Sequence, residues 1–404
     1  MFVFTEGKEM TSKAKTLVVL LLFLCVFPEN SSASLWGNLS LGVNSEANVY
    51  KYVFPYSDSY SYFDFGLNFK DKLANSTRLL GTYTLRDSRY AAWGAKNYTE
   101  HLAGINIDQD IMSGLAGILL LQGDYLLYPS NDKYNYMDLS ANFAFRVFLF
   151  FFEYTNIDIG AKYNNFDYLN YNFSVEGWTP SLSFREEVSS YTGLSPYLAI
   201  RQQLSSDIDA ELNLMSSTKE YRERPLYSFD GSTYAYTSVY RVDTETNING
   251  KVTLKPLKQL SLSLGANYLG VISNANAKAY DPAATGQTTL AEGYYDRTDL
   301  GLSFNCFYYY GEESSYAKIG INYTGKKYLN RIAQDDQGAW TAAKREDNTY
   351  SAQVELNQMI GLMFGTNWVL KLSYTYERSY SNDYYYNYSD ETFGIIVTSY
   401  IYLF

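Results

Sequence analysis

Alternation of apolar and polar residues over segments of ten or more residues is the feature that most constrains this chain. In the longest segment, from Tyr240 to Lys255, apolar or threonine side chains alternate with charged residues and amides. Successive side chains of an extended strand point to opposite faces, so the pattern predicts a strand with one apolar and one polar face. Comparable segments start at residues 63, 79, 139, 208, 260, 300, 319, 350 and 370, and none shows helical period. The chain is therefore predicted to be all-β.

A soluble sandwich also buries one face of each strand, so alternation alone does not identify the fold. The segments are longer than the five or six residues usual for strands of soluble domains. Many of the 43 tyrosines gather at their ends, as in Tyr308–Tyr310 and Tyr384–Tyr386, and tyrosine suits a membrane–water interface. Short predicted connections (Lys255–Gln259, Gly311–Ser314, Ile360–Asn367) alternate with long ones (Arg222–Thr233, Asn274–Gly293, Leu329–Asp347, Ser381–Asp390). These features favour a single transmembrane antiparallel up-and-down β-barrel.

The amino-terminal segment has the pattern of a secretory signal peptide. Lys13 and Lys15 precede the apolar run Leu17–Phe27, and small residues follow at 30–34. A helix of that apolar length spans roughly 16 Å, too short for a hydrocarbon core of roughly 30 Å. We expect cleavage after Ala33 or Ser34. The predicted division is a signal peptide, 1–34, and an outer-membrane β-barrel, 35–404.

The carboxy-terminal stretch carries the one family resemblance in the chain. Large side chains recur at every second position, through Tyr400 and Tyr402 to the terminal Phe404. With the signal segment and the alternating strands, this ending resembles bacterial outer-membrane, porin-like β-barrel proteins, although no subfamily motif matches. The resemblance implies that the barrel-insertion machinery reads Tyr402 and Phe404 as an insertion signal. It also implies the lipid bilayer of the bacterial outer membrane as the protein's surroundings.

The number of strands follows from parity, because both termini of such a barrel lie on the periplasmic side and the number must be even. Seventeen segments qualify, and the inconsistency falls between Val147 and Leu194. A long loop over roughly Asn164–Gly193 gives sixteen strands, and a hidden hairpin there gives eighteen. The run Val147–Phe152 lacks any turn residue where a turn is needed. We predict sixteen strands, with eighteen as the alternative.

A barrel of sixteen strands encloses a lumen wide enough for water. The charged residues on the polar faces are candidate pore-lining residues: Arg78, Arg86, Arg201, Arg241, Asp243, Glu245, Lys251, Lys318, Glu355, Lys371 and Glu377. Such charges either act on passing solutes or pair across neighbouring strands to support the wall. The favoured function is passive diffusion of small polar solutes or ions. By analogy with general diffusion porins, the loop over Asn164–Gly193 is a candidate constriction.

Other classes of function receive less support from the residues. His101 is the single histidine, and its parity places it on the apolar face. Neither the G-x-S-x-G nor the H-E-x-x-H motif occurs, so no enzyme, catalytic residue, metal site or cofactor is predicted. A net charge of −11 without a basic run argues against nucleic acid as a partner. A single cysteine, Cys306, would remain after cleavage, which excludes an internal disulfide framework.

A barrel that serves as a sheath or scaffold for an exported or periplasmic partner is the alternative function. Strand pattern begins almost at once after Ser34, which argues against the substrate-recruiting domains of secretion ushers. A homotrimer and an unidentified protein partner both stay open. The transported solute and its selectivity do not follow from the sequence.

Overall fold

The computed structural model describes residues 34–49, 51, 55–149, 154–169, 190–230, 234–280, 288–311, 315–363 and 365–402. Within them the secondary structure is β-strand with three short 3-10 turns. The strands are β1 (Ser34–Glu46), β2 (Asp58–Ala74), β3 (Thr77–Tyr90), β4 (Tyr98–Met112), β5 (Leu115–Leu127), β6 (Tyr136–Leu149), β7 (Thr155–Tyr168), β8 (Tyr191–Ser205), β9 (Ile208–Phe229), β10 (Tyr234–Leu257), β11 (Leu260–Ser273), β12 (Asn276–Tyr280), β13 (Thr288–Glu292), β14 (Arg297–Tyr309), β15 (Tyr316–Gln334), β16 (Trp340–Met363), β17 (Thr366–Ser381) and β18 (Tyr388–Tyr402).

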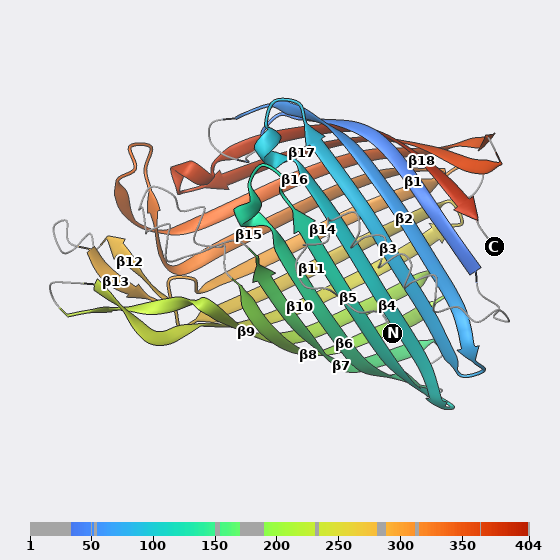
Figure 1. Ribbon diagram of the computed structural model, residues 1–404, viewed down its shortest axis with the longest axis horizontal. Helices are drawn as coiled ribbons and strands as arrows, with labels where there is room; N and C mark the ends of the chain where they lie inside the picture. Colours follow the sequence, from blue (N-terminus) through green and yellow to red (C-terminus); the bar gives the residue numbers. More distant parts are fainter. Residues whose placement is uncertain are drawn as a thin grey trace, which may run out of the picture.

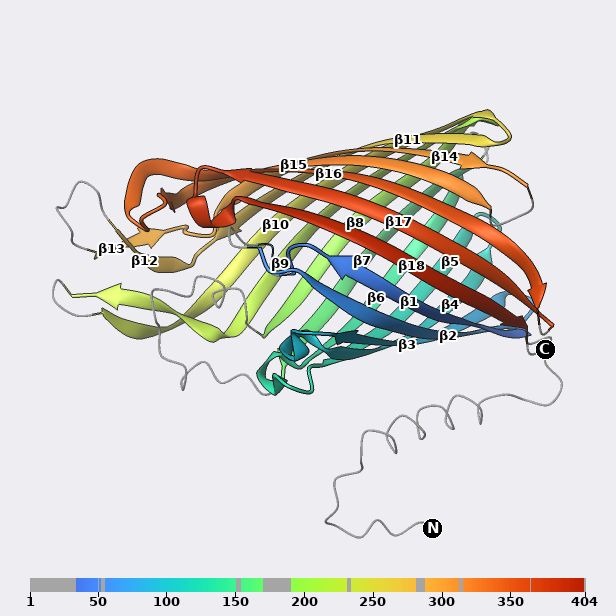
Figure 2. The ribbon, with the colours of Figure 1, turned by 90° about the horizontal axis from the view of Figure 1, so that it is seen from above.

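Sixteen of these strands form one closed antiparallel barrel, which confirms the predicted fold and strand number. Each strand pairs with its neighbours in sequence, except that β11 pairs with β14 because β12 and β13 form a separate two-stranded sheet. The barrel closes where β1 pairs with β18, from Trp36 opposite Tyr402 to Glu46 opposite Thr392. Figure 2 shows the resulting tube, with the first and last strands side by side. Closure pairs every edge, which a sheet within a bilayer requires.

The two ends of the barrel differ in the length of their connections. At one end, turns as short as Asn75–Ser76 and Lys258–Gln259 join the strands. At the other end, which we call the mouth, lie the 3-10 turns η1 (Gly94–Lys96), η2 (Asp132–Tyr134) and η4 (Tyr384–Tyr386) and the β12–β13 hairpin. In Figure 1 the hairpin and the extended strands project at the left, and β18 ends at the right. This is the predicted rhythm of short and long connections.

Three connections at the mouth share one closing device. Asn97, Asn135 and Asn387 each follow a 3-10 turn and precede a tyrosine. Their side-chain oxygens accept hydrogen bonds of 2.7, 2.6 and 3.0 Å from the backbone N–H groups of Tyr90, Tyr128 and Ser381. An amide at this position replaces a backbone partner that the turn removes from the ladder. Short polar turns thereby hold neighbouring strand ends together.

Three of the predicted long loops contain strand: Asn274–Gly293 includes the β12–β13 hairpin, and the described chain in two others is mainly strand. The stretch Arg222–Thr233 is strand as far as Phe229, and Leu329–Asp347 is strand except between β15 and β16. Register shifts interrupt these extensions, between Tyr236 and Val242 on β10 and between Lys327 and Gln334 on β15. Strands that project beyond a bilayer meet water on both faces. Alternation therefore fades there although the backbone pairing continues.

The region between Val147 and Leu194, where the strand count was uncertain, contains β7 and the start of β8. These two strands pair with each other on either side of a long connection. Asn164 and Gly193 are paired within β7 and β8, so the predicted loop over Asn164–Gly193 was too wide. The connection itself, 170–189, lies outside the described residues, as does the proposed inward folding of that loop. β6 continues to Leu149, and Tyr154 just before β7 has a φ of 60°. A tyrosine in the left-handed region explains why the sequence showed no glycine or asparagine turn signal.

The predicted signal segment, 1–34, lies outside the described residues except for Ser34, where β1 begins. Among the described residues, no helix has the length and apolar character needed to cross a bilayer.

Candidate functional site: the lumen of the barrel

The two faces of the barrel wall are distinguished by both chemistry and exposure. On β16 the apolar side chains of Val354 and Leu356 are 54% and 39% exposed, whereas Glu355 between them is 4% exposed. Side chains diverge on the convex side of a closed sheet and converge on its concave side, where they shield one another. The apolar face is therefore the outer one, and the polar face lines the lumen. An outer belt of exposed leucine, isoleucine, phenylalanine and tyrosine is the surface that lipid requires.

Register places all eleven candidate residues on the inner face. Directly opposed residues share a face, and one such row runs through Glu211, Lys251, Gly265, Ser303, Asn322, Ser351 and Glu377. Each candidate also contacts a polar or charged partner: Arg78 with Asp110, Arg86 with Asp64 and Glu100, Arg201 with Asp158, Arg241 with Asp243, Glu245 with Lys219, Lys251 with Glu211, Lys318 with Gln353, Glu355 with Lys371, and Glu377 with Lys51.

Several of these partners were missed in the sequence, because pairing depends on register between segments far apart in the chain. Asp158 is an example: it binds Arg146 at 2.7 Å and Arg201 at 3.4 Å from the two neighbouring strands. The alternation of Asp158 with apolar neighbours was the only feature of the sequence that could have indicated its inward position. An acid between two arginines has its charge compensated, so this cluster supports the wall as well as lining the lumen.

Arg241 and Asp243 face inward but have little contact with the lumen. They are 8% and 2% exposed. The Arg241 guanidinium lies 4.4 Å from the ring centre of Tyr221 and 3.6 Å from that of Tyr295. Two aromatic rings thus cover the arginine and bring a residue of the β13–β14 connection onto the wall. The predicted pore-lining role of this pair stays a prediction; in the structure the two residues lie beneath tyrosines and help to hold the mouth together.

The same arrangement occurs a second time on β16 and β17. Arg345 binds Asp347 at 2.6 Å, and its guanidinium lies 3.1 Å from the ring centre of Tyr386. In both places a serine of the next strand donates to the aspartate: Ser273 to Asp243 at 2.5 Å, and Ser381 to Asp347 at 2.6 Å. The following asparagines, Asn274 and Asn382, accept from the backbone N–H between each arginine and aspartate. In the sequence this arrangement corresponds to an Arg-x-Asp motif on one strand and a Ser-Asn pair on the next, a signal that the sequence-based search missed.

Carboxylates on the strands that leave the mouth form two groups around the barrel. On β18, β2, β4 and β6 the acid follows an inward-facing tyrosine by two residues, and on β10, β14 and β16 it follows an arginine: Tyr388–Asp390, Tyr62–Asp64, Tyr98–Glu100, Tyr136–Asp138, Arg241–Asp243, Arg297–Asp299 and Arg345–Asp347. The three arginines contact their own acids at 2.6–3.3 Å. The part of the mouth formed by β18, β2, β4 and β6 is therefore acidic. On β10, β14 and β16 the arginines neutralise the carboxylates.

The wall formed by β11, β14, β15 and β16 is uncharged over three successive inward-facing positions. These positions hold only hydroxyls, amides and glycines: Ser263, Gly265, Asn267, Gly301, Ser303, Asn305, Gly320, Asn322, Thr324, Thr349, Ser351 and Gln353. Charges return at both margins, with Asp299 and Lys326 toward the mouth and Lys318 and Glu355 toward the short turns. The sequence search selected charged residues and so overlooked this wall.

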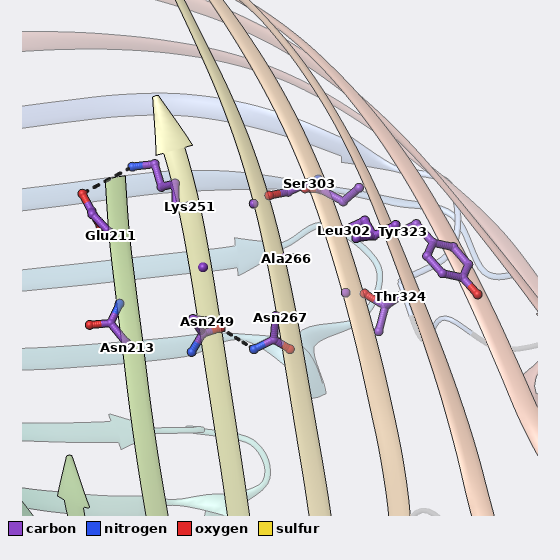
Figure 3. A pocket seen from close by; sticks show the side chains of 14 residues that line it. Glu211, Asn213, Asn249, Lys251, Ala266, Asn267, Leu302, Ser303, Tyr323 and Thr324 are labelled. Atoms are coloured by element: carbon purple, nitrogen blue, oxygen red, sulfur yellow. Dashed lines mark hydrogen bonds and ion pairs between the residues drawn. The ribbon is translucent and has the colours of Figure 1, made fainter. Parts of the chain in front are cut away.

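A recess of about 460 Å³ opens in this uncharged wall and continues onto β9 and β10. Asn213, Asn249 and Asn267 stand side by side on three neighbouring strands (Figure 3). The Asn267 amide donates to Asn249 and, at 3.1 Å, to Asn247. Glu211 and Lys251, 4.0 Å apart, form one edge. Because Gly301 has no side chain, the wall is hollow beside Asn267.

His101 lies on the outer face, opposite Leu85 and Tyr125. Its Nδ1 is 2.9 Å from the hydroxyl of Tyr83. A histidine facing lipid and bonded to a tyrosine is an interfacial residue rather than a catalytic base in the lumen. Among the described residues, no group of three or more His, Cys, Asp or Glu side chains is arranged to hold a metal ion.

Tyr402, the last tyrosine of the chain, lies on the inner face of the barrel, opposite to the outer apolar belt. Tyr402 pairs with Trp36, and Tyr400 pairs with Asn38, so both follow the inner-face register. The outward positions of β18 are Phe393, Ile395 and Val397. Phe404 lies outside the described residues. The insertion signal predicted at Tyr402 and Phe404 stays a prediction.

No protein-family model matches the chain, and no curated relative matches it in sequence. Solved structures with a similar fold include OccK8 (OprE) of Pseudomonas aeruginosa, with 9% identity over 92% of this chain and 99% of that one, at a TM-score of 0.47. OccAB3 of Acinetobacter baumannii has 7% identity over 92% and 100%, at 0.48. In-vitro folded OmpT, an outer membrane protein of Vibrio cholerae, has 9% over 93% and 99%, at 0.45. All three TM-scores lie below 0.5, and the fold rests on the chain's own strand pairing, which is that of a closed, sixteen-stranded antiparallel β-barrel.

Proposed function

We propose that this protein is a bacterial outer-membrane channel for the passive diffusion of small polar solutes or ions, and not an enzyme. The observation that carries the proposal is the contrast between the two faces of the closed wall. Outside is a continuous apolar belt, and inside are charged pairs, amides and hydroxyls. A sixteen-stranded barrel is wide enough to hold water beside such side chains. Polar solutes crossing it would exchange hydration water for wall groups and return to water beyond.

The proposal includes the route to the membrane. Export would use the segment 1–34 as a cleaved signal peptide, and the barrel-insertion machinery would recognise the carboxy-terminal strand. The lipid bilayer then surrounds the outer belt, which carries exposed tyrosines such as Tyr374 toward the mouth and Tyr308 toward the short turns. Tyrosine places its ring in the apolar zone and its hydroxyl in water. Neither nucleic acid nor a cofactor has a part in this proposal.

Single-channel recording from the folded, detergent-solubilised barrel in planar bilayers tests the channel. We expect a stable conductance that rises with salt concentration. Folding is verified separately by heat-modifiable migration on a gel. Protein that is folded but gives no current contradicts the proposal and favours the alternative of a sheath or scaffold filled by an exported or periplasmic partner.

A further inference from the structure

We propose that the recess in the uncharged wall is a binding site for neutral polyhydroxylated solutes of mono- or disaccharide size. The site deepens the proposed channel and rests on it for its biological meaning, since a solute reaches the recess through the lumen. The chemistry of the lining, its charge and its shape each favour this class of ligand.

The lining offers both hydrogen-bond donors and acceptors, as a polyol does. The side-chain amide of Asn213 has no hydrogen bond to any residue that the structure describes, so both of its ends are available. Hydroxyls of Ser303 and Thr324 face the same space from β14 and β15. The mutual bonds of Asn247, Asn249 and Asn267 fix the remaining amides in place. Fixed groups lose less conformational freedom when a ligand binds.

The charge of the recess favours a neutral ligand over an ion. Of its described lining residues only Glu211 and Lys251 are charged, and they oppose each other at 4.0 Å. An ion entering would lose hydration without finding a net opposite charge. A neutral polyol instead replaces water at each amide and hydroxyl with little desolvation cost. The carboxylates of β18, β2, β4 and β6 lie on another part of the wall.

The shape of the recess also fits a ligand of this size. Gly301 leaves space that side chains fill elsewhere along β14, whereas the Ser303 hydroxyl already lies beside Gly265. A Cβ added to Gly301 would meet Asn267 Cβ at 3.5 Å, an ordinary contact, so the backbone itself accepts a side chain there. The hollow therefore exists because the residue is glycine and not because the strands are too close. Its volume falls within the range of roughly 300–1,000 Å³ usual for small-molecule sites.

Saturation-transfer NMR on the folded barrel with sucrose tests binding directly, without any need for current. The detergent must have a headgroup that is not a sugar. We expect transfer to the sucrose protons that saturates with concentration. Gly301→Leu, which fills the hollow, and Asn213→Leu, which removes the unbonded amide, should each raise the half-saturating concentration at least five-fold. Gly250→Leu is the matched control: Gly250 borders the recess only with its backbone, its Cβ position faces outward like those of Leu212 and Ala266, and a Cβ there meets nothing within 4 Å.

The outcomes separate the site from the channel. Sucrose binding that is lost in both variants and kept in Gly250→Leu supports the site, whether or not the barrel conducts. Transfer that is absent, or equal in all four folded proteins, overturns the site even if the conductance is normal. A barrel that binds sucrose at the recess but passes no current would contradict the proposed function alone.

Discussion

Ser381 donates a 2.6 Å hydrogen bond to Asp347, the carboxylate that also binds Arg345, and so joins β17 to the buried ion pair on β16. Arg345 and Asp347 are 4% and 6% exposed. A buried pair of this kind needs further hydrogen bonds to offset the desolvation of its charges. The corresponding bond between Ser273 and Asp243 shows that the barrel uses the same solution at a second strand pair.

We expect Ser381→Ala to destabilise the protein by about 1.5–3 kcal/mol, since it loses the buried bond to the charged Asp347 together with the bond that Ser381 Oγ accepts from the Asp383 N–H. Ser399→Ala is the matched control: its hydroxyl bonds the neutral Thr366 at 2.9 Å and should cost about 1 kcal/mol. Urea unfolding of both variants in lipid vesicles measures the difference. Equal losses would mean that the serine adds nothing specific to the ion pair.

The mouth should loosen at low pH through Asp58, which lies ahead of Phe63, the first outward-facing apolar residue of β2. Burial of the Asp58 carboxyl raises its pKa, but hydrogen bonds from the backbone N–H groups of Trp93, Ser59 and Ala92 lower it by more, so the pKa lies below its ordinary value. A lowered pKa means that the stabilisation is complete above the pKa of the unfolded chain, about 4. It is lost as the pH falls through the still lower pKa of the folded protein.

Amide exchange of Ala92 and Trp93 checks this pH dependence. Exchange should become faster, relative to unstructured peptide, as the pH falls below about 4. In Asp58→Asn protection should be weaker at neutral pH and should no longer change over that range. A wild-type profile that is flat to lower pH would show that the carboxylate does not hold the β3–β4 connection.

The acidic side of the mouth should make the channel prefer cations. Asp64, Glu100 and Asp138 follow tyrosines, and Arg86 alone bridges two of them at 3.1 Å each. The double variant Glu100→Gln and Asp138→Asn should lower the cation-to-anion permeability ratio roughly two-fold at low salt, because charges in a narrow wet passage act within a Debye length. Reversal potentials in a salt gradient measure the ratio.

Asp336→Asn is the control for that measurement, since Asp336 is exposed in the turn between β15 and β16. It should leave the ratio unchanged. An anion preference in the wild type, or the same shift from Asp336→Asn, would show that the inner carboxylates do not set selectivity.

The mature protein should begin at Ser34 or Leu35. The expectation comes from the small residues at 30–34 that end the signal segment. Mass spectrometry of protein from an outer-membrane fraction determines the amino terminus. A mass that includes residues 1–33 would contradict cleavage.

Phe404→Ala should lower the amount of folded barrel in the membrane several-fold without changing the conductance of molecules that do insert. Tyr402→Ala should act in the same direction if both residues belong to one insertion signal. Quantifying heat-modifiable protein in membranes, together with single-channel recording, separates assembly from transport. Normal assembly of both variants would remove the proposed signal.

Much of the barrel could be predicted from the sequence, because the bilayer imposes a local rule. Each strand must alternate, so the apolar face at Ile248 and Val252 and the polar face at Glu245 and Lys251 were assigned correctly from the residues alone. Parity of the strands then left sixteen or eighteen, and sixteen was the prediction. The rule fails beyond the bilayer, where water meets both faces, and so the extensions of β9, β15 and β16 were mistaken for loops.

The contacts between strands could not be predicted in the same way. The bonds of Asp158 to Arg146 and Arg201, and the burial of Arg241 beneath Tyr221 and Tyr295, depend on register and on how connections fold at the mouth. The uncharged wall was equally hidden, because Asn267, Ser303 and Asn322 are ordinary polar residues one strand at a time. The sequence by itself determines the alternation along each strand, and this alternation assigns each residue to the inner or the outer face. Only the closed tertiary structure decided which residues on that face meet, since cross-strand pairing joins segments that the chain order keeps apart.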